Sequence, residues 1–368
     1  MRYTRLDGLR GLLSVIVALN HSFLILAIPA SANIWGANIF IFHGLQSKLQ
    51  QIFMLLGNGG LAVTIFFVLS GFVLGESFGK GRHTIKNSAV FLIRRLLRLY
   101  PVYLILVIVS ALYMWSGFRY QTYQAASPWF HWWMNFEMSF KELLLNAFFI
   151  HIYLGGVTWT LRVIIIASLL FPLMYIIFKK ASLLINFGLI VLLTIASFTI
   201  FDLHRFIDLR YLYMFYLGLT IPRSKHFFVS LQPALHAITL IPFVFIAFYL
   251  RFITDIYQAM VFESLFAWLL IGLIVYNSTR IFLFLESRLF QFLGRISYSL
   301  YLTHFTVLYI FSKIVLDIIP AAILAQNYFL AHGLIFLVTL ALTIPVSLLV
   351  HRFIESPAQS ISRAVKIG

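Results

Sequence analysis

Long apolar runs recur along the whole chain and dominate its pattern of hydrophobic and polar positions. About 20 apolar residues, rising 1.5 Å each in a helix, cross a hydrocarbon core of about 30 Å. Ten runs approach this length, near residues 9–29, 60–79, 99–117, 159–178, 183–201, 209–222, 231–250, 259–277, 296–316 and 328–350. The pattern therefore predicts an all-α polytopic membrane protein with about ten transmembrane helices.

The basic residues predict the orientation of these helices, because cytoplasmic connections of membrane proteins carry an excess of Lys and Arg. With a cytoplasmic N-terminus, 19 of the 27 basic residues fall in cytoplasmic segments. We therefore expect ten spans with both termini in the cytoplasm. The run Leu143–Leu154 is too short to cross comfortably, and counting it would move every later basic cluster outside. We expect a re-entrant or interfacial helix there, on the outer side.

Composition narrows the class of protein further. Hydrophobic residues make up 62% of the 368 residues and charged residues only 10%, against about 25% charged in soluble domains. Too few polar residues remain to cover a soluble surface, so we expect one integral-membrane domain over residues 1–368, surrounded by lipids, with no fused soluble domain. Cysteine is absent, which excludes disulfides, thiolate nucleophiles and Cys-ligated metals, and no metal site is expected. Basic cytoplasmic loops account for the net charge of +16, so it does not indicate nucleic-acid binding.

Two ionisable residues stand in the first apolar run. Arg10 and His21 are eleven residues apart, which places them within about 20° on one helix face, about 16 Å apart along the axis. An arginine at the cytoplasmic mouth suits a phosphate-bearing ligand, and a histidine deeper in the membrane suits proton transfer. The alternative is a snorkelling arginine and a histidine that bonds a neighbouring helix.

A basic cluster lies at the cytoplasmic entry to the third run and comprises Arg94, Arg95 and Arg98. Arg94 and Arg98 share a helix face at i,i+4, a spacing that suits phosphate groups. The alternative is an ordinary cytoplasmic anchor of a membrane helix.

A polar seam interrupts the ninth run, where Ser297, Tyr301 and His304 share one helix face. Its histidine has two interpretations, as a hydrogen-bonding residue between helices or as a catalytic group.

Six stretches, taken in order, resemble the membrane-bound acyltransferase 3 family. They are Arg5–Gly11 with His21, Phe66–Phe72 (FFVLSGF), Arg94–Pro101 (RRLLRLYP), Trp159–Leu161 (WTL), Leu293–Tyr301 (LGRISYSLY) with His304, and Glu355–Pro357 (ESP). The resemblance covers essentially the whole chain, and the family's ten-span layout agrees with the charge pattern.

The resemblance implies transfer of an acyl group, usually acetyl, from cytoplasmic acetyl-CoA to a hydroxyl of a carbohydrate or lipid-linked glycan. It implies a location in the bacterial inner membrane and a glycan or glycolipid acceptor. A separate extracytoplasmic protein would be needed for any hand-off outside. For this chain, the resemblance implies His21 as the catalytic group, with Arg10 and Asp7 beside it. Further site residues would be the CoA-binding arginines and a substrate or structural seam, namely Arg94, Arg95, Arg98, Trp159, Ser297, Tyr301 and His304.

One position departs from the family's pattern. The tryptophan motif of that family commonly continues to a glutamate, and Ile164 stands there in this chain. A carboxylate at this point would orient His21 or act as its acid/base partner. The other carboxylates considered for this role are Asp7, Glu137, Glu142 and Asp202. Three interpretations stay open: a subfamily that dispenses with the group, a weakened or inactive homologue, or an altered sequence.

Two other classes of protein compete with the enzyme. A transporter or flippase would explain polar residues in spans and the positive charge without CoA, but it predicts paired broken helices in matching halves. A structural or scaffolding membrane protein leaves Arg10, His21 and His304 at membrane depth without a purpose.

Overall fold

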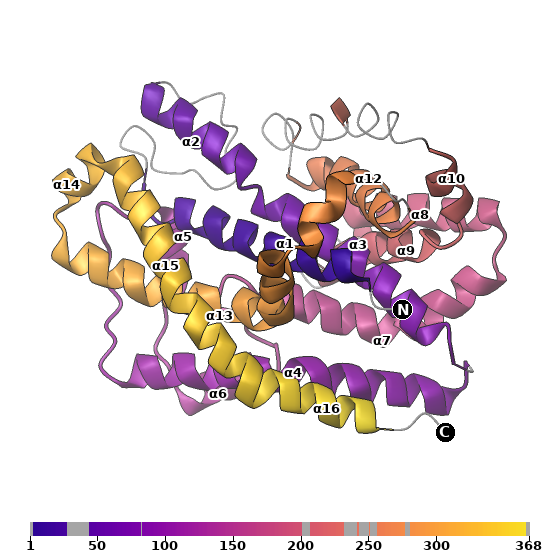
Figure 1. Cartoon of the computed structure of the whole chain (residues 1–368). Coiled ribbons are helices and arrows are strands. Elements are labelled where there is room, and N and C mark those ends of the chain that lie inside the picture. Colours follow the sequence, from indigo (N-terminus) through magenta and orange to yellow (C-terminus); the bar gives the residue numbers. More distant parts are fainter. Residues whose placement is uncertain are drawn as a thin grey trace.

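The computed structural model describes residues 3–27, 44–81, 83–200, 207–231, 241–242, 250, 256–276 and 280–365. Over these residues the chain is helical apart from loops and a single isolated β-bridge between Leu26 and Ala126. Figure 1 shows the longer helices packed side by side, with α2, α5, α6 and α14 gathered toward one end and α10 toward the other.

The elements follow one another without any sheet in the described residues. In chain order they are α1 (Thr4–Phe23), α2 (Leu45–Leu56), α3 (Gly59–Phe78), α4 (Ile85–Trp115), α5 (Pro128–Trp132), α6 (Phe140–Ala147), α7 (Thr158–Lys180), α8 (Leu183–Phe198), the 3₁₀ helix η3 (Ile207–Tyr211), α9 (Leu212–Thr220), α10 (Lys225–Ser230), α12 (Ile256–Tyr276), the 3₁₀ helix η4 (Arg280–Glu286), α13 (Arg288–Ile318), α14 (Ala321–Gln326), α15 (Tyr328–Val350), the π-helix η5 (His351–Glu355) and α16 (Ser356–Ala364).

Six helical segments of the described residues are long and apolar enough to cross a membrane. They are Leu45–Phe78, Ile85–Trp115, Thr158–Lys180, Gln258–Tyr276, Arg288–Ile318 and Tyr328–Ala364. The chain is therefore an all-α, multi-pass membrane protein. The count of ten spans and the cytoplasmic position of both termini remain predictions.

The helices differ from the apolar runs at two places. Helix α1 ends at Phe23, where Leu24 caps it, although the run continued to residue 29. The run 209–222 forms η3 and the nine-residue α9, and nine helical residues cover only about 14 Å. Its apolar character reflects packing inside the protein, since α9 is buried from Leu212 to Leu219. Most of the run 231–250 lies outside the described residues.

The short run Leu143–Leu154 does not form a long helix. Helix α6 ends at Ala147, and an irregular segment leads from there to α7. Helix α6 is bonded to α4 near its end, because the Tyr103 hydroxyl donates to the Asn146 carbonyl oxygen at 2.5 Å. The prediction that this run is not a transmembrane helix is consistent with these bounds.

The close packing of α1 against α13 fixes the centre of the molecule. A Cβ atom at Gly11 would lie closer than 3.0 Å to backbone atoms of Leu293 and Gly294, and one at Gly294 would collide with the Asp7 carbonyl oxygen. Ser14 adds a hydrogen bond from its hydroxyl to the Ser297 carbonyl oxygen, at 3.1 Å. The two backbones therefore touch through glycines, as small residues permit in membrane helix pairs.

We predict that Gly11→Ala and Gly294→Ala each destabilise the protein, by about 1–3 kcal/mol, because the added methyl group has no space between the helices. The matched control is Gly333→Ala in α15, where a Cβ meets nothing within 4 Å; it should leave stability unchanged or raise it by up to about 1 kcal/mol. Thermal unfolding of the detergent-solubilised protein measures both effects. Equal melting temperatures for all three variants would contradict the close packing.

Candidate functional site

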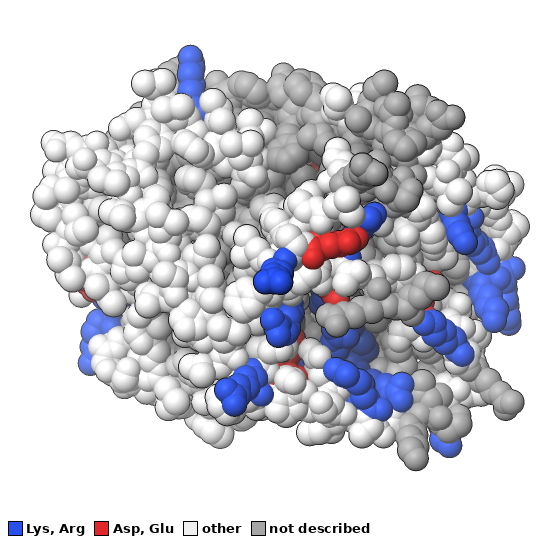
Figure 2. Space-filling view, viewed as in Figure 1, with Lys and Arg blue, Asp and Glu red and all other residues white. Residues whose placement is uncertain are grey.

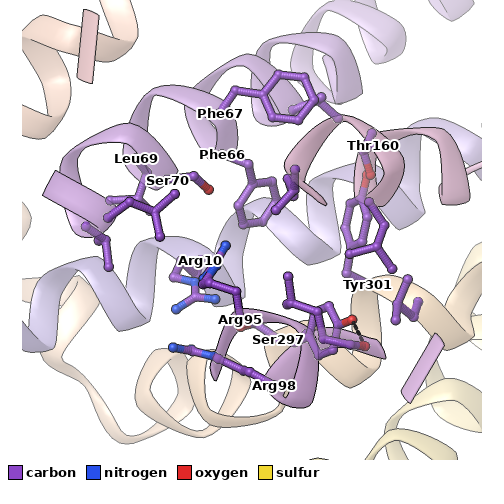
Figure 3. Close-up of a pocket in the computed structure, with 18 residues that line it drawn as sticks. Arg10, Phe66, Phe67, Leu69, Ser70, Arg95, Arg98, Thr160, Ser297 and Tyr301 are labelled. Carbon is purple, nitrogen blue, oxygen red and sulfur yellow. Dashed lines mark hydrogen bonds between the residues drawn. The ribbon is translucent and has the colours of Figure 1, made fainter. Parts of the chain in front are cut away.

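A cavity opens among α1, α3, α4, α7 and α13 (Figure 3). Its polar lining consists of three arginines and five hydroxyl-bearing side chains, and the rest is aliphatic or phenyl. The lining residues are Arg10, Val63, Phe66, Phe67, Leu69, Ser70, Val73, Leu74, Arg95, Arg98, Leu99, Thr160, Leu161, Ile164, Ser297, Tyr298, Tyr301 and Leu302. The cavity thus has the character of a site for a ligand with both anionic and apolar parts.

Three guanidinium groups line one part of this cavity. Arg10 comes from α1 and meets Arg95 and Arg98 from α4, and Figure 3 shows the three side chains converging. Within the described residues none of the three forms an ion pair with a carboxylate, and Nε of Arg95 is buried without a hydrogen-bond partner. Asp7 and Glu355 are the carboxylates whose charges act on Arg10. A cluster of like charges with spare donors is an anion site.

Arg94 lies apart from the other two arginines of its cluster. Its guanidinium donates from Nε to the Val365 carbonyl oxygen at 2.8 Å, and the Ser362 hydroxyl donates to the Arg94 carbonyl oxygen at the same distance. It does not line the cavity. The structure therefore brings Arg10, Arg95 and Arg98 together, whereas Arg94 bonds Val365, directly after α16.

A hydrogen-bonded pair of hydroxyls joins α7 to α13 at the cavity wall. The Thr160 hydroxyl donates to the Val157 carbonyl oxygen at 2.7 Å, so the Tyr301 hydroxyl is the donor in its 3.0 Å contact with Thr160. Ile164, one turn further along α7, lines the same cavity. The position where a glutamate was expected is therefore on the cavity wall, and it is apolar.

Trp159 does not line the cavity, although its neighbours in the motif do. Its ring packs against Phe67 and Tyr211, with centroids 6.1 and 5.3 Å away. The tryptophan therefore supports the α3–α7 wall. Ser297 lines the cavity and donates its hydroxyl to the Gly294 carbonyl oxygen at 2.9 Å.

His21 and His304 form a direct pair beyond Tyr301. Nδ1 of His21 lies 3.0 Å from Nε2 of His304, and the two rings stack at 5.2 Å between centroids. The ring of Tyr301 lies 6.0 Å from that of His304. The polar seam predicted on α13 thus runs from the cavity wall to the histidine of α1.

The segment around α5 covers this histidine pair. Trp129 lies 5.2 Å from the His21 ring, between centroids. Ser127 fastens the segment to the chain that follows α1, because its backbone N–H donates to the Ile25 carbonyl oxygen at 2.8 Å and its hydroxyl donates to the Leu24 carbonyl oxygen. Nearby, Nε2 of His131 accepts a hydrogen bond from the Tyr123 backbone N–H at 2.9 Å. Burial lowers the pKa of His131, which agrees with a neutral ring that accepts.

Three of the four carboxylates considered as partners of His21 have other surroundings. Asp7 acts on Arg10, Glu142 pairs with His151 at 2.8 Å, and Glu137 is exposed. Asp202 lies outside the described residues. In the part of the chain that the structure describes, the hydrogen-bond partner of His21 is His304.

Two buried carboxylates accept hydrogen bonds that link helices, and the sequence analysis did not predict these contacts. Glu355 is 3% exposed and accepts hydrogen bonds from Ser299 at 2.6 Å and Gln359 at 2.8 Å. Glu263 is fully buried in α12 and accepts from Asn58 at 3.2 Å and Thr64 at 3.3 Å. A carboxylate inside an apolar run is itself a signal of a polar site, and this signal could have identified Glu263 from the sequence.

Comparison with known proteins gives one match. A protein-family model described as an acyltransferase domain matches residues 3–352, which is essentially the whole chain. No curated protein matches, and no solved structure matches.

We predict that Glu355→Gln destabilises the protein by about 1–3 kcal/mol, because a buried carboxylate that accepts several hydrogen bonds is replaced by an amide that competes as a donor. The control is Glu286→Gln, which breaks a half-exposed ion pair with Arg5 and should cost less than about 1 kcal/mol. Denaturation in detergent measures both. Indistinguishable stabilities would show that the Glu355 network contributes nothing beyond a surface pair.

Proposed function

The chain belongs to the acyltransferase family that this match defines, and we propose that it moves an acyl group, acetyl in the simplest case, from acyl-CoA to a hydroxyl of a glycan or glycolipid. As a member of that family with several membrane-crossing helices it is a membrane acyltransferase. The observation that carries the finer proposal is the cavity in which three arginines, none paired with a carboxylate of the described residues, face apolar walls.

The donor proposal rests on charge and shape. Coenzyme A carries several phosphates and a long, weakly polar arm that ends in the thioester. Guanidinium groups bind phosphates through paired, charge-assisted hydrogen bonds, and Arg10, Arg95 and Arg98 offer such donors at one part of the cavity. The aliphatic and phenyl lining suits the arm and the acyl group. We propose acetyl-CoA as the donor, with no metal required.

The chemical step proposed for His21 needs one unprotonated ring nitrogen. In direct transfer, His21 takes the proton of the acceptor hydroxyl while the oxygen attacks the thioester carbonyl. The C–S bond then breaks, and the leaving thiolate takes the proton from the imidazolium. In the covalent route, the same nitrogen attacks the thioester carbonyl, the C–S bond breaks and CoA leaves as a thiolate. The acceptor oxygen then attacks the acyl-imidazole, the C–N bond breaks, and the proton of the hydroxyl passes to the thiolate. Both routes consume one acyl-CoA and release one CoA thiol.

The proposed setting is the bacterial inner membrane, with the arginine-lined part of the cavity reached from the cytoplasm, where acyl-CoA is made. Figure 2 shows most Lys and Arg side chains of the visible face toward one part of the molecule and a largely uncharged surface elsewhere. This distribution agrees with an apolar band in contact with membrane lipids. A glycan or glycolipid acceptor approaches from the other side, and a separate extracytoplasmic protein completes any hand-off there.

We predict that membranes containing the protein transfer label from [¹⁴C]acetyl-CoA into glycan or glycolipid, and that His21→Ala lowers this rate at least about 10²-fold because the base is lost. Ile164→Glu serves as a comparison at the cavity wall and should not exceed the parent. Label incorporated only by Ile164→Glu would identify a disabled homologue. No label with any of the three, over a panel of acceptors, would contradict the enzyme and favour a transporter.

We predict that Arg98→Gln weakens binding of CoA about tenfold or more, because one charge-assisted phosphate contact is lost. Arg94→Gln is the matched control, four residues away in the same helix but bonded to Val365, and should change the Kd for CoA less than about threefold. Calorimetric titration with CoA and with 3′-dephospho-CoA measures the effect and tests which phosphate is bound. An equal loss of affinity for CoA in the two variants would show that the arginine-lined cavity is not the donor site.

A further inference from the structure

The partner of His21 is another imidazole, although a carboxylate is the usual group behind a catalytic histidine. His304 is fully buried, at 0% exposure, and its Nε2 lies 3.0 Å from Nδ1 of His21. Its other nitrogen, Nδ1, lies 3.2 Å from the Leu300 carbonyl oxygen of the preceding turn. Both nitrogens of His304 therefore have a partner, one of them an oxygen that can only accept.

These contacts determine where the protons are. A carbonyl oxygen has no hydrogen to donate, so Nδ1 of His304 carries the N–H. A neutral imidazole has one N–H only, which leaves Nε2 of His304 as an acceptor. Nδ1 of His21 must then be the donor in the contact between the two rings. The remaining nitrogen of His21, Nε2, is left without a proton.

The surroundings of the pair favour this neutral arrangement. The other rings in contact with it are Trp129, Phe305 and Tyr301, all of them uncharged. A second proton on His304 would place an unpaired charge in this buried site, which costs free energy. Nε2 of His304 would then donate to Nδ1 of His21 instead of accepting from it. The proton of His21 would have to lie on Nε2, and this nitrogen could no longer act as a base.

We propose that His304 is the positioning residue that sets the tautomer and ring orientation of His21, so that Nε2 of His21 is the unprotonated nitrogen presented to the acceptor hydroxyl. This assignment rests on the proposed acyl transfer. When Nε2 takes the hydroxyl proton, the N–H donated to His304 becomes a charge-assisted hydrogen bond and strengthens. When the thiolate recovers that proton, the neutral pair is restored, and His304 neither gains nor loses a proton over the cycle.

The test compares two replacements of His304 in the full-length protein. His304→Phe keeps a planar ring against His21 but has no acceptor, and we expect kcat to fall about 10²-fold or more while KM for acetyl-CoA changes less than about threefold. His304→Gln keeps an amide oxygen near the position of Nε2 and an N–H₂ group, and we expect it to retain at least about a tenth of kcat. A wrong tautomer in a catalytic triad costs up to about 10⁴-fold, which sets the upper scale.

His332→Phe is the matched control. His332 is also buried and also bonds α1, through Nδ1 to the Ser22 carbonyl oxygen at 3.0 Å, next to His21. It forms no contact with the His21 ring in the described residues, so kcat per folded molecule should stay within about threefold. A similar loss in His332→Phe and His304→Phe would mean that packing around α1 matters and would overturn the proposal. Equal inactivity of the Gln and Phe variants, with unchanged binding of CoA, would also overturn it.

A spectroscopic readout separates this proposal from the acyl transfer itself. ¹⁵N-histidine NMR of the detergent-solubilised protein, with His21→Ala used to assign the signal, reports which nitrogen of His21 carries the proton. We expect Nδ1–H in the parent and in His304→Gln, and a mixture of tautomers in His304→Phe. An Nε2–H signal in the parent would overturn the proposal even if transfer is observed. An Nδ1–H signal without any transfer would uphold it and defeat the proposed function alone.

Discussion

The contact between α1 and α13 is the constraint on which the rest of the structure depends. Backbone meets backbone at Gly11 and Gly294, where main-chain atoms of the other helix already fill the space that a methyl group would need. The groups of the candidate site that α1 and α13 carry are placed by this contact. It sets Arg10 beside the arginines of α4, and it brings His21 within hydrogen-bond reach of His304 two turns beyond Ser297. Small residues therefore set the distance between the two helices, and this distance determines where the polar side chains of both helices lie.

The sequence allowed the helices to be predicted wherever hydrophobicity meant contact with lipid. Helix α15 has the bounds of its apolar run, Tyr328–Val350, and α7 agrees within two residues at each end. At α9 the structure does not test the predicted span, because a helix buried inside a membrane protein is as apolar as one that faces lipid. Hydropathy has no means of separating these two environments. The ionisable residues of the candidate site were identified because they interrupt apolar runs. A charged side chain inside a membrane is costly, so its presence indicates a function.

The sequence analysis named several residues that line the cavity or form the histidine pair, but it did not predict which of them lie together. Helical periodicity placed Arg94 with Arg98, yet long flexible side chains decide where a guanidinium ends, and Arg94 bonds the Val365 carbonyl oxygen. The partner of His21 was sought among carboxylates, and it is His304, from a helix 283 residues away in sequence. Such a pairing depends on which helices meet, and no local pattern contains that information. With His304 behind His21, the apolar Ile164 on the cavity wall no longer leaves the histidine without an orienting group.

Helix α9 has a consequence for how the chain reaches its native state. Its nine residues are too few to span a bilayer alone, and Leu212 to Leu219 are all buried against other parts of the protein. Gly71 and Gly218 let it touch the backbone of α3 directly. The contacts that bury α9 exist only once the neighbouring helices are in place. We therefore expect α9 to reach its packed position late in folding, after the longer helices have inserted.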